Sequence, residues 1–202
     1  MNKGLVSVLA VVGVLLVLAL GIAGWYFGVK NGLVGQEESV SSAWSQVQNV
    51  YQRRADLIPN LVKTVQAYAE HEQDTLLGVT EARSKVNNIN LGNATNDPAK
   101  MEQFLRAQGE LGSALSRLMV VVEKYPDLKA NENFRDLQVQ LEGTENRITV
   151  ERMRYNDAAQ VFNTRIRQFP ASIVAQMSGF DRKAYFEAQA GADKAPEVNF
   201  NR

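Results

Sequence analysis

An apolar run near the N-terminus constrains how this chain can fold. No charged residue occurs from Leu5 to Phe27, and these 23 positions are nearly all leucine, valine, alanine and glycine. As a helix, the run would be about 35 Å long, enough to cross the hydrocarbon core of a bilayer. Trp25 and Tyr26 stand at its end, where aromatic rings favour the headgroup layer. The run therefore predicts one membrane-spanning helix, within an anchor of residues 1–30.

A cleaved signal peptide is the alternative interpretation of this run. Small residues between Ala19 and Ala23 suit a cleavage site, but the apolar part of a signal peptide usually has only about 7–15 residues, so we favour an uncleaved anchor. Lys3 and the terminal amino group precede the run, and only Lys30 follows it closely. The positive-inside rule therefore favours a cytoplasmic N-terminus, with the bulk of the chain extracytoplasmic.

The composition excludes several classes of function. The 202 residues include 22 lysines and arginines, 22 acidic residues, one histidine and no cysteine. Nucleic-acid binding usually needs a basic surplus, which this chain lacks. Without cysteine there is no disulfide, thiol nucleophile, zinc finger or iron–sulfur cluster. No nucleotide-binding glycine motif or nucleophile elbow occurs either, so we expect a protein that is not an enzyme and has no cofactor.

Beyond the anchor, apolar residues recur every seven positions, a spacing typical of helices that pack along their length. Long helices are predicted at 37–88, 98–124 and 133–169, with a short one at 171–176. Pro59 lies inside the first and cannot donate a helical hydrogen bond, so a kink or break is expected there. The predicted fold is all-α: a transmembrane helix, an elongated antiparallel bundle over residues 31–186, and a polar, mobile tail at 187–202.

Charged residues interrupt these apolar rows and are candidates for a polar layer inside the bundle. Arg54 falls in a row of the first helix, where it could pair with Glu145 or Glu151 from the third helix and fix the helix register. Glu72 is a further interruption. In the alternative interpretation, Arg54 extends along its aliphatic stem into solvent. The sequence favours neither.

The segment Tyr125–Phe134 joins the second and third helices at one end of the predicted rod. In a structural interpretation, Asn131 caps the third helix and the two aromatic residues close the bundle end. In a functional interpretation, this turn is a docking tip. Aromatic residues on the first helix could likewise contact a partner bundle or a second copy. The candidate interaction or turn residues are Trp44, Tyr51, Tyr125 and Asp127.

The single histidine, His71, lies among acidic residues in the segment Glu70–Asp74. Metal ligands on one helix need a spacing of three or four residues, whereas Glu70 and Glu72 are direct neighbours of His71. No metal ligand is therefore predicted. A metal-dependent enzyme built around His71 is only a distant alternative.

Three segments of the chain resemble the LemA family of bacterial membrane proteins. They are AWSQVQNVYQRRADLIPNLVKTVQAYAEHE (Ala43–Glu72), EKYPDLKANENFRDLQVQLEGTENRI (Glu123–Ile148) and ERMRYNDAAQVFNTRIRQFP (Glu151–Pro170). The resemblance extends from about Val34 to Phe186. It implies a bundle of long helices and a role in the cell envelope, and it brings no catalytic residues.

These observations predict a non-enzymatic, membrane-anchored helical scaffold or interaction protein of the bacterial cell envelope. Long helices tethered at one end offer grooves and surfaces rather than an enclosed substrate site. The expected partners are the lipid bilayer, another protein and possible further copies of the chain, but not nucleic acid. The alternative function is an accessory subunit of a membrane protease or transporter.

Overall fold

The computed structural model describes residues 3–92 and 94–187. All regular secondary structure in these residues is helical, which confirms the predicted all-α fold. The helices are α1 (Lys3–Gln66), α2 (Gln73–Asn87), α3 (Pro98–Val122), α4 (Pro126–Ala130), α5 (Glu132–Arg165) and α6 (Ala171–Ser178). The predicted mobile tail lies outside the described residues, apart from Glu187.

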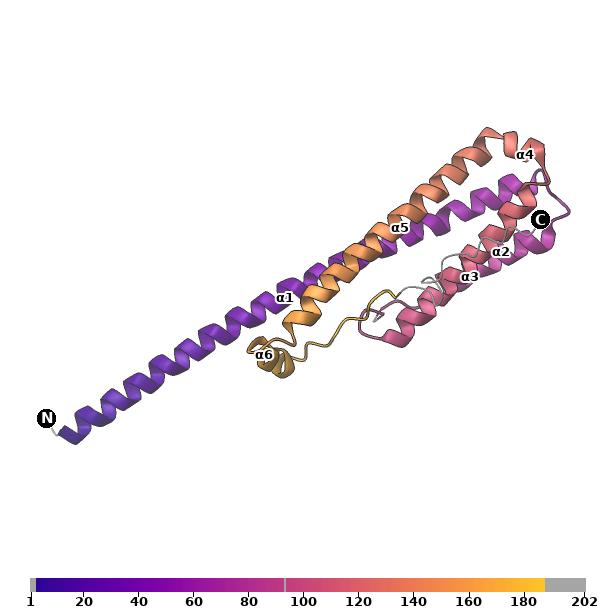
Figure 1. Ribbon diagram of the computed structural model, residues 1–202. Coiled ribbons are helices and arrows are strands. Elements are labelled where there is room, and N and C mark those ends of the chain that lie inside the picture. The colour runs from indigo at the N-terminus through magenta and orange to yellow at the C-terminus, as the bar shows by residue number, and fades with distance from the viewer. Residues whose placement is uncertain (1–2, 93, 188–202) are drawn as a thin grey trace, which may run out of the picture.

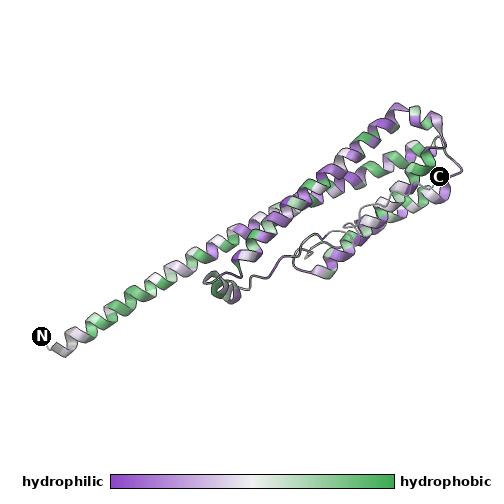
Figure 2. Cartoon of the chain, viewed as in Figure 1, coloured by the Kyte–Doolittle hydropathy of each residue, from purple (hydrophilic) through white to green (hydrophobic). Residues whose placement is uncertain are grey.

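Helix α1 is 64 residues long and extends about 96 Å. Its first part projects from the rest of the molecule, and Figure 2 shows that this part is mostly hydrophobic. The large apolar side chains between Val8 and Ile22 are 46% to 72% exposed. Among the described residues, α1 is long and apolar enough to cross a membrane. It continues without a break through the predicted boundary between anchor and bundle at residues 30 and 31.

Two antiparallel helix pairs form the bundle (Figure 1). The second part of α1 packs along α5, and α2 packs along α3. Helix α4 leads from α3 into α5 at the end far from the N-terminus, whereas α6 lies beside α1 close to the apolar part. The apolar part of α1 and the bundle therefore follow one another along a common axis.

The expected break at Pro59 is wrong, because α1 continues to Gln66 and the chain reverses only at residues 67–72. The missing N–H of Pro59 leaves the carbonyl of Ala55 without its helical donor. Arg83 on α2 replaces that donor: its Nε atom lies 2.7 Å from the Ala55 oxygen. The first predicted bundle helix is therefore two antiparallel helices, and the bundle has four long helices instead of three.

Side-chain caps fix the beginnings of α3 and α5. Asp97 accepts hydrogen bonds from the backbone N–H groups of Ala99 and Lys100. Asn131 accepts one from the N–H of Phe134 at 3.0 Å. Such caps satisfy donors that the first turn of a helix leaves free. The sequence had offered Asn131 as the cap of the third predicted helix.

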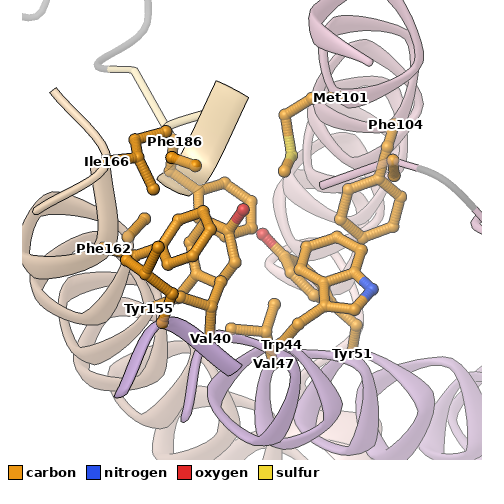
Figure 3. Close-up of a cluster of buried hydrophobic side chains, with 14 of the residues drawn as sticks. Val40, Trp44, Val47, Tyr51, Met101, Phe104, Tyr155, Phe162, Ile166 and Phe186 are labelled. Carbon is orange, nitrogen blue, oxygen red and sulfur yellow. The ribbon is translucent and has the colours of Figure 1, made fainter. Parts of the chain in front are cut away.

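The buried apolar residues form two clusters along the bundle. The cluster near the apolar part of α1 contains six aromatic residues, and Figure 3 shows rings contributed by α1, α3, α5 and the segment after α6. The cluster at the far end is mainly aliphatic and joins α1, α2, α3 and α4 with the start of α5. On α1, the first cluster reaches Tyr51 and the second begins at Ile58. Arg54 lies between them.

The Arg83 hydrogen bond gives a testable explanation for the unbroken helix at Pro59. Replacing Arg83 with methionine removes the donor, and we expect the free energy of unfolding to fall by about 1–2 kcal/mol. In a Pro59→Ala background the same change should cost less, because the introduced alanine supplies its own N–H to the Ala55 carbonyl. Urea denaturation in detergent, followed by circular dichroism, measures both costs. Equal costs in the two backgrounds would contradict the explanation.

Candidate functional site

A polar layer separates the two apolar clusters. Arg54 Nη1 donates to Glu145 Oε2 at 2.7 Å, and Nη2 donates to the side-chain oxygen of Gln108 and to its backbone oxygen at 3.4 Å. Arg54 and Gln108 are each only 6% exposed, whereas the Glu145 side chain is 59% exposed. The layer thus connects α1, α3 and α5, with its acidic member at the surface.

This layer contains more hydrogen-bond donors than acceptors. Arg54 Nε and Gln108 Nε2 are both buried, and neither has a partner in the structure. A buried donor without an acceptor costs free energy, because it has lost its water and gained nothing in exchange. The centre of the bundle therefore has unused capacity to bind an acceptor.

The structure separates the other two predicted members from the layer. Glu151 Oε1 instead lies 2.8 Å from Arg154 Nη1 on the same helix. Glu72 accepts a hydrogen bond from the Tyr125 hydroxyl at 3.2 Å, at the far end of the bundle. Gln108 was missed, although it occupies the gap between Met101 and Leu115 in a seven-residue apolar row of α3. A polar residue at this position of the row was the sequence signal that could have identified Gln108.

A double-mutant cycle tests the coupling between Arg54 and Glu145. We expect Arg54→Met to cost about 1–3 kcal/mol of unfolding free energy, because it removes the donor to Gln108. Glu145→Gln should cost at most about 1 kcal/mol, since the carboxylate is exposed. The two effects should be less than additive. Glu151→Gln is the matched control and should be additive with Arg54→Met; coupling to Glu151 instead of Glu145 would contradict the observed layer.

A groove of about 1090 Å³ lies against the polar layer, and Arg54, Gln108 and Glu145 are part of its lining. Its lining comes from α1, α3, α5 and the segment after α6. The C-terminal part of its α3 wall consists of small residues, and a Cβ atom added at Gly112 would meet nothing within 4 Å. The small residues of this wall are Gly109, Gly112, Ser113 and Ser116. The α3 face is therefore open.

The two candidate interaction residues on α1 lie inside the bundle. Trp44 is 7% exposed and contacts the rings of Phe104, Tyr155 and Phe186. Tyr51 is also buried, with its ring edge-on to Phe104 at 4.9 Å between centroids, and it contributes to the groove lining. Their aromatic surface therefore serves the chain's own core, as Figure 3 shows.

Asparagine side chains hold the extended segment 180–187 at one end of the groove. Asn163 donates to the carbonyl of Lys183 at 2.9 Å and accepts from its N–H at 2.8 Å. Asn156, seven residues earlier on α5, makes the same pair of bonds with Phe186, both at 2.9 Å. Each amide thus binds the backbone at two points. The segment is recognised through its main chain.

Charged and aromatic contacts complete this attachment. The Lys183 ammonium lies 2.6 Å from a Glu37 carboxylate oxygen on α1 and 2.9 Å from the Asn96 side-chain oxygen. Tyr155 donates its hydroxyl proton to the carbonyl of Ala184 at 2.8 Å. Burial raises the pKa of Tyr155, with a smaller contribution from Tyr185. The hydroxyl is therefore a protonated donor at neutral pH.

Tyr51 is one of two tyrosines in the groove wall, the other being Tyr185. Burial raises the pKa of Tyr51, while the positive charges of Arg152 and Arg54 oppose that shift. The net shift is upward, so Tyr51 also stays protonated at neutral pH. Neither buried tyrosine is suited to act as a base.

Removing one asparagine tests the main-chain attachment. We expect Asn163→Ala to lower the free energy of unfolding by about 2 kcal/mol, because two buried backbone groups of Lys183 lose their partner. The variant should also be cleaved faster by trypsin next to Lys183. Asn146→Ala, an exposed position on the same helix, is the matched control. Unchanged cleavage in Asn163→Ala would show that other contacts hold the segment.

The turn between α3 and α5 is well packed. Tyr125 contacts Glu72, and Asn131 donates to the Tyr68 hydroxyl at 3.0 Å while capping α5. Asp127 is exposed in the first turn of α4. Asp127 is therefore the candidate turn residue that remains accessible to a partner.

The metal hypothesis finds no site in the described part of the chain. His71 is exposed, in the turn between α1 and α2. Within residues 3–92 and 94–187, no three histidine or carboxylate side chains gather in a way that could hold a metal ion. The structure thus offers no geometry for a metal-dependent reaction at His71.

An elongated helical bundle continuous with a long apolar N-terminal helix defines a class of membrane-associated proteins. The LemA family model matches residues 43–200, which is most of the chain. The chain belongs to the LemA family. This agrees with the resemblance seen in the sequence.

Curated relatives include two kinds of protein. Magnetosome protein MamQ 2 of Paramagnetospirillum magneticum is 29% identical over 96% of this chain and 76% of its own length. Magnetosome protein MamQ of Magnetospirillum gryphiswaldense is 26% identical over 81% of this chain and 66% of its own length. Protein LemA of Metamycoplasma hominis is 28% identical over 85% of this chain and 75% of its own length.

Proposed function

We propose that this protein is a non-enzymatic scaffold of the cell envelope that presents a protein-binding bundle at a fixed distance from the membrane. The observation that carries the proposal is the continuity of α1, which runs from the apolar part into the bundle core. Between Phe27 and Arg54 this helix extends about 40 Å.

The surface of the bundle suits binding better than catalysis. Its groove is open and lined by small and charged residues, and the buried tyrosines stay protonated. An interaction protein needs an accessible surface held in one orientation, which a single long helix provides. The positive-inside count supports an extracytoplasmic bundle. In the alternative function, this protein is an accessory subunit, and the partner that its bundle binds is a membrane protease or transporter.

Cysteine crosslinking in intact cells tests this proposal, because the chain contains no cysteine of its own. We would place single cysteines at Ser113 in the groove, Asp127 at the far turn and Val139 on the exposed face of α5. Each variant is labelled with a membrane-impermeant, thiol-specific photocrosslinker and irradiated. We expect at least one position to capture a discrete protein, identified by mass spectrometry.

The controls separate function from orientation. The cysteine-free chain should capture nothing. Capture only after permeabilisation would leave the scaffold proposal intact and place the bundle on the cytoplasmic side. If all three positions fail to capture a protein in both intact and permeabilised cells, the scaffold proposal is wrong.

A further inference from the structure

The groove above the polar layer has a chemistry that specifies its occupant. We propose that it binds an acidic segment of a partner protein, in extended form, with its carboxylates directed to the arginines of the groove. This inference rests on the proposed scaffold function and names the class of partner. Four features of the groove carry it: length, net charge, unused donors and distance from the membrane.

The dimensions fit a peptide rather than a single small anion. The part of α3 that lines the groove runs from Pro98 to Ser116, which is about 27 Å of helix. At about 3.3 Å per residue, this length accommodates about eight extended residues. The glycines and serines of the α3 wall leave room for a backbone to approach. One end of the groove already holds an extended segment, residues 182–187 of the chain itself.

The charge of the groove favours an acidic occupant. Five cationic side chains line it, against three carboxylates, and one of the five, Lys183, is paired with Glu37 outside the lining. Arg182 has no carboxylate partner among the described residues, and Arg152, which also has none, donates to the Glu187 backbone oxygen at 3.2 Å and lies over the Phe186 ring. Arg106 is 68% exposed and pairs only with Glu102 on its own helix. The cationic side chains are Arg54, Arg106, Arg152, Arg182 and Lys183.

The floor of the groove needs acceptors. Arg54 Nε and Gln108 Nε2 lie in side chains that are more than nine-tenths buried and line the groove, yet neither atom has an acceptor. The carboxylate that does reach Arg54 comes from Glu145, which is mostly exposed. A carboxylate entering the groove could therefore replace the exposed Glu145 carboxylate at Arg54 Nη1. Arginine and carboxylate match in charge and in hydrogen-bond geometry.

An anionic lipid headgroup is a poor candidate for this occupant. Arg54 lies about 40 Å along α1 from the end of the apolar run at Phe27, and Glu37, which binds the groove residue Lys183, lies about 15 Å from that end. Electrostatic attraction to a lipid surface fades within a Debye length of about 8 Å at physiological salt. The acidic groups must therefore come from a molecule outside the bilayer.

Binding of a model acidic peptide tests the inference. The full chain, held in phosphatidylcholine nanodiscs, is titrated against fluorescein-labelled decaglutamate, and fluorescence anisotropy reports binding. Labelled decalysine is the peptide control. We expect saturable binding of decaglutamate and none of decalysine. Absence of saturable decaglutamate binding, or equal binding of decalysine, overturns the inference.

Two pairs of variants locate the binding site. Gly112→Trp fills the groove, whereas Gly143→Trp on α5 adds the same bulk at a position with equally open space outside the lining. We expect Gly112→Trp to weaken binding at least tenfold and Gly143→Trp to leave it unchanged. Equal affinities for the two variants would contradict binding in the groove. Circular dichroism confirms that both variants fold.

The second pair tests charge. Arg106→Glu with Arg182→Glu reverses two exposed groove charges, whereas Arg117→Glu with Arg135→Glu makes the same net change outside the groove. The double variant Arg106→Glu, Arg182→Glu should weaken binding at least tenfold more than the double variant Arg117→Glu, Arg135→Glu. Equal weakening would reduce the effect to overall charge and overturn the inference. Capture of a partner from Asp127 or Val139 but not from Ser113 would also overturn it, while leaving the scaffold function standing.

Discussion

The continuity of helix α1 is the constraint on which the rest of the structure depends. The same helix carries the apolar run at its N-terminal end and packs against α5 along the bundle. A hinge between the two parts would leave the bundle free to reorient, whereas an unbroken helix fixes its axis to that of the anchor. The ion pair between Lys183 and Glu37 joins the C-terminal segment to α1 where α1 enters the bundle.

The polar layer at Arg54 divides the bundle into two regions with different packing. On one side, interlocking aromatic rings join α1, α3 and α5 to the extended C-terminal segment. On the other side, aliphatic residues join α1 to the α2–α3 pair and the α4 turn. A buried guanidinium can be satisfied at few positions along a helix, so the layer restricts helix sliding. It also leaves polar surface at the base of the groove.

Sequence patterns predicted helices more reliably than their interruptions. The seven-residue rows correctly indicated an all-α bundle, and the turn segment offered Asn131 as the cap of α5, whereas the sequence did not decide between a buried and a solvent-reaching Arg54. The proline rule failed at Pro59, because it considers only donors from the same helix. Arg83 lies 24 positions further along the chain, and no local rule predicts that its side chain will reach the Ala55 carbonyl. Likewise, the sequence left both Glu145 and Glu151 open as partners for Arg54, and only packing selected Glu145.

The sequence alone determined the apolar helix and the helical class of the bundle, because these follow from local composition and periodicity along the chain, and three of its segments carried the resemblance to the LemA family. The tertiary structure decided which polar groups meet: Arg54 with Gln108 and Glu145, and Asn156 and Asn163 with the backbone of the C-terminal segment. It also decided that the small-residue face of α3 remains open as a groove wall. Such outcomes depend on helix rotation and spacing, which are set by all contacts of the bundle together and leave no local trace in the sequence.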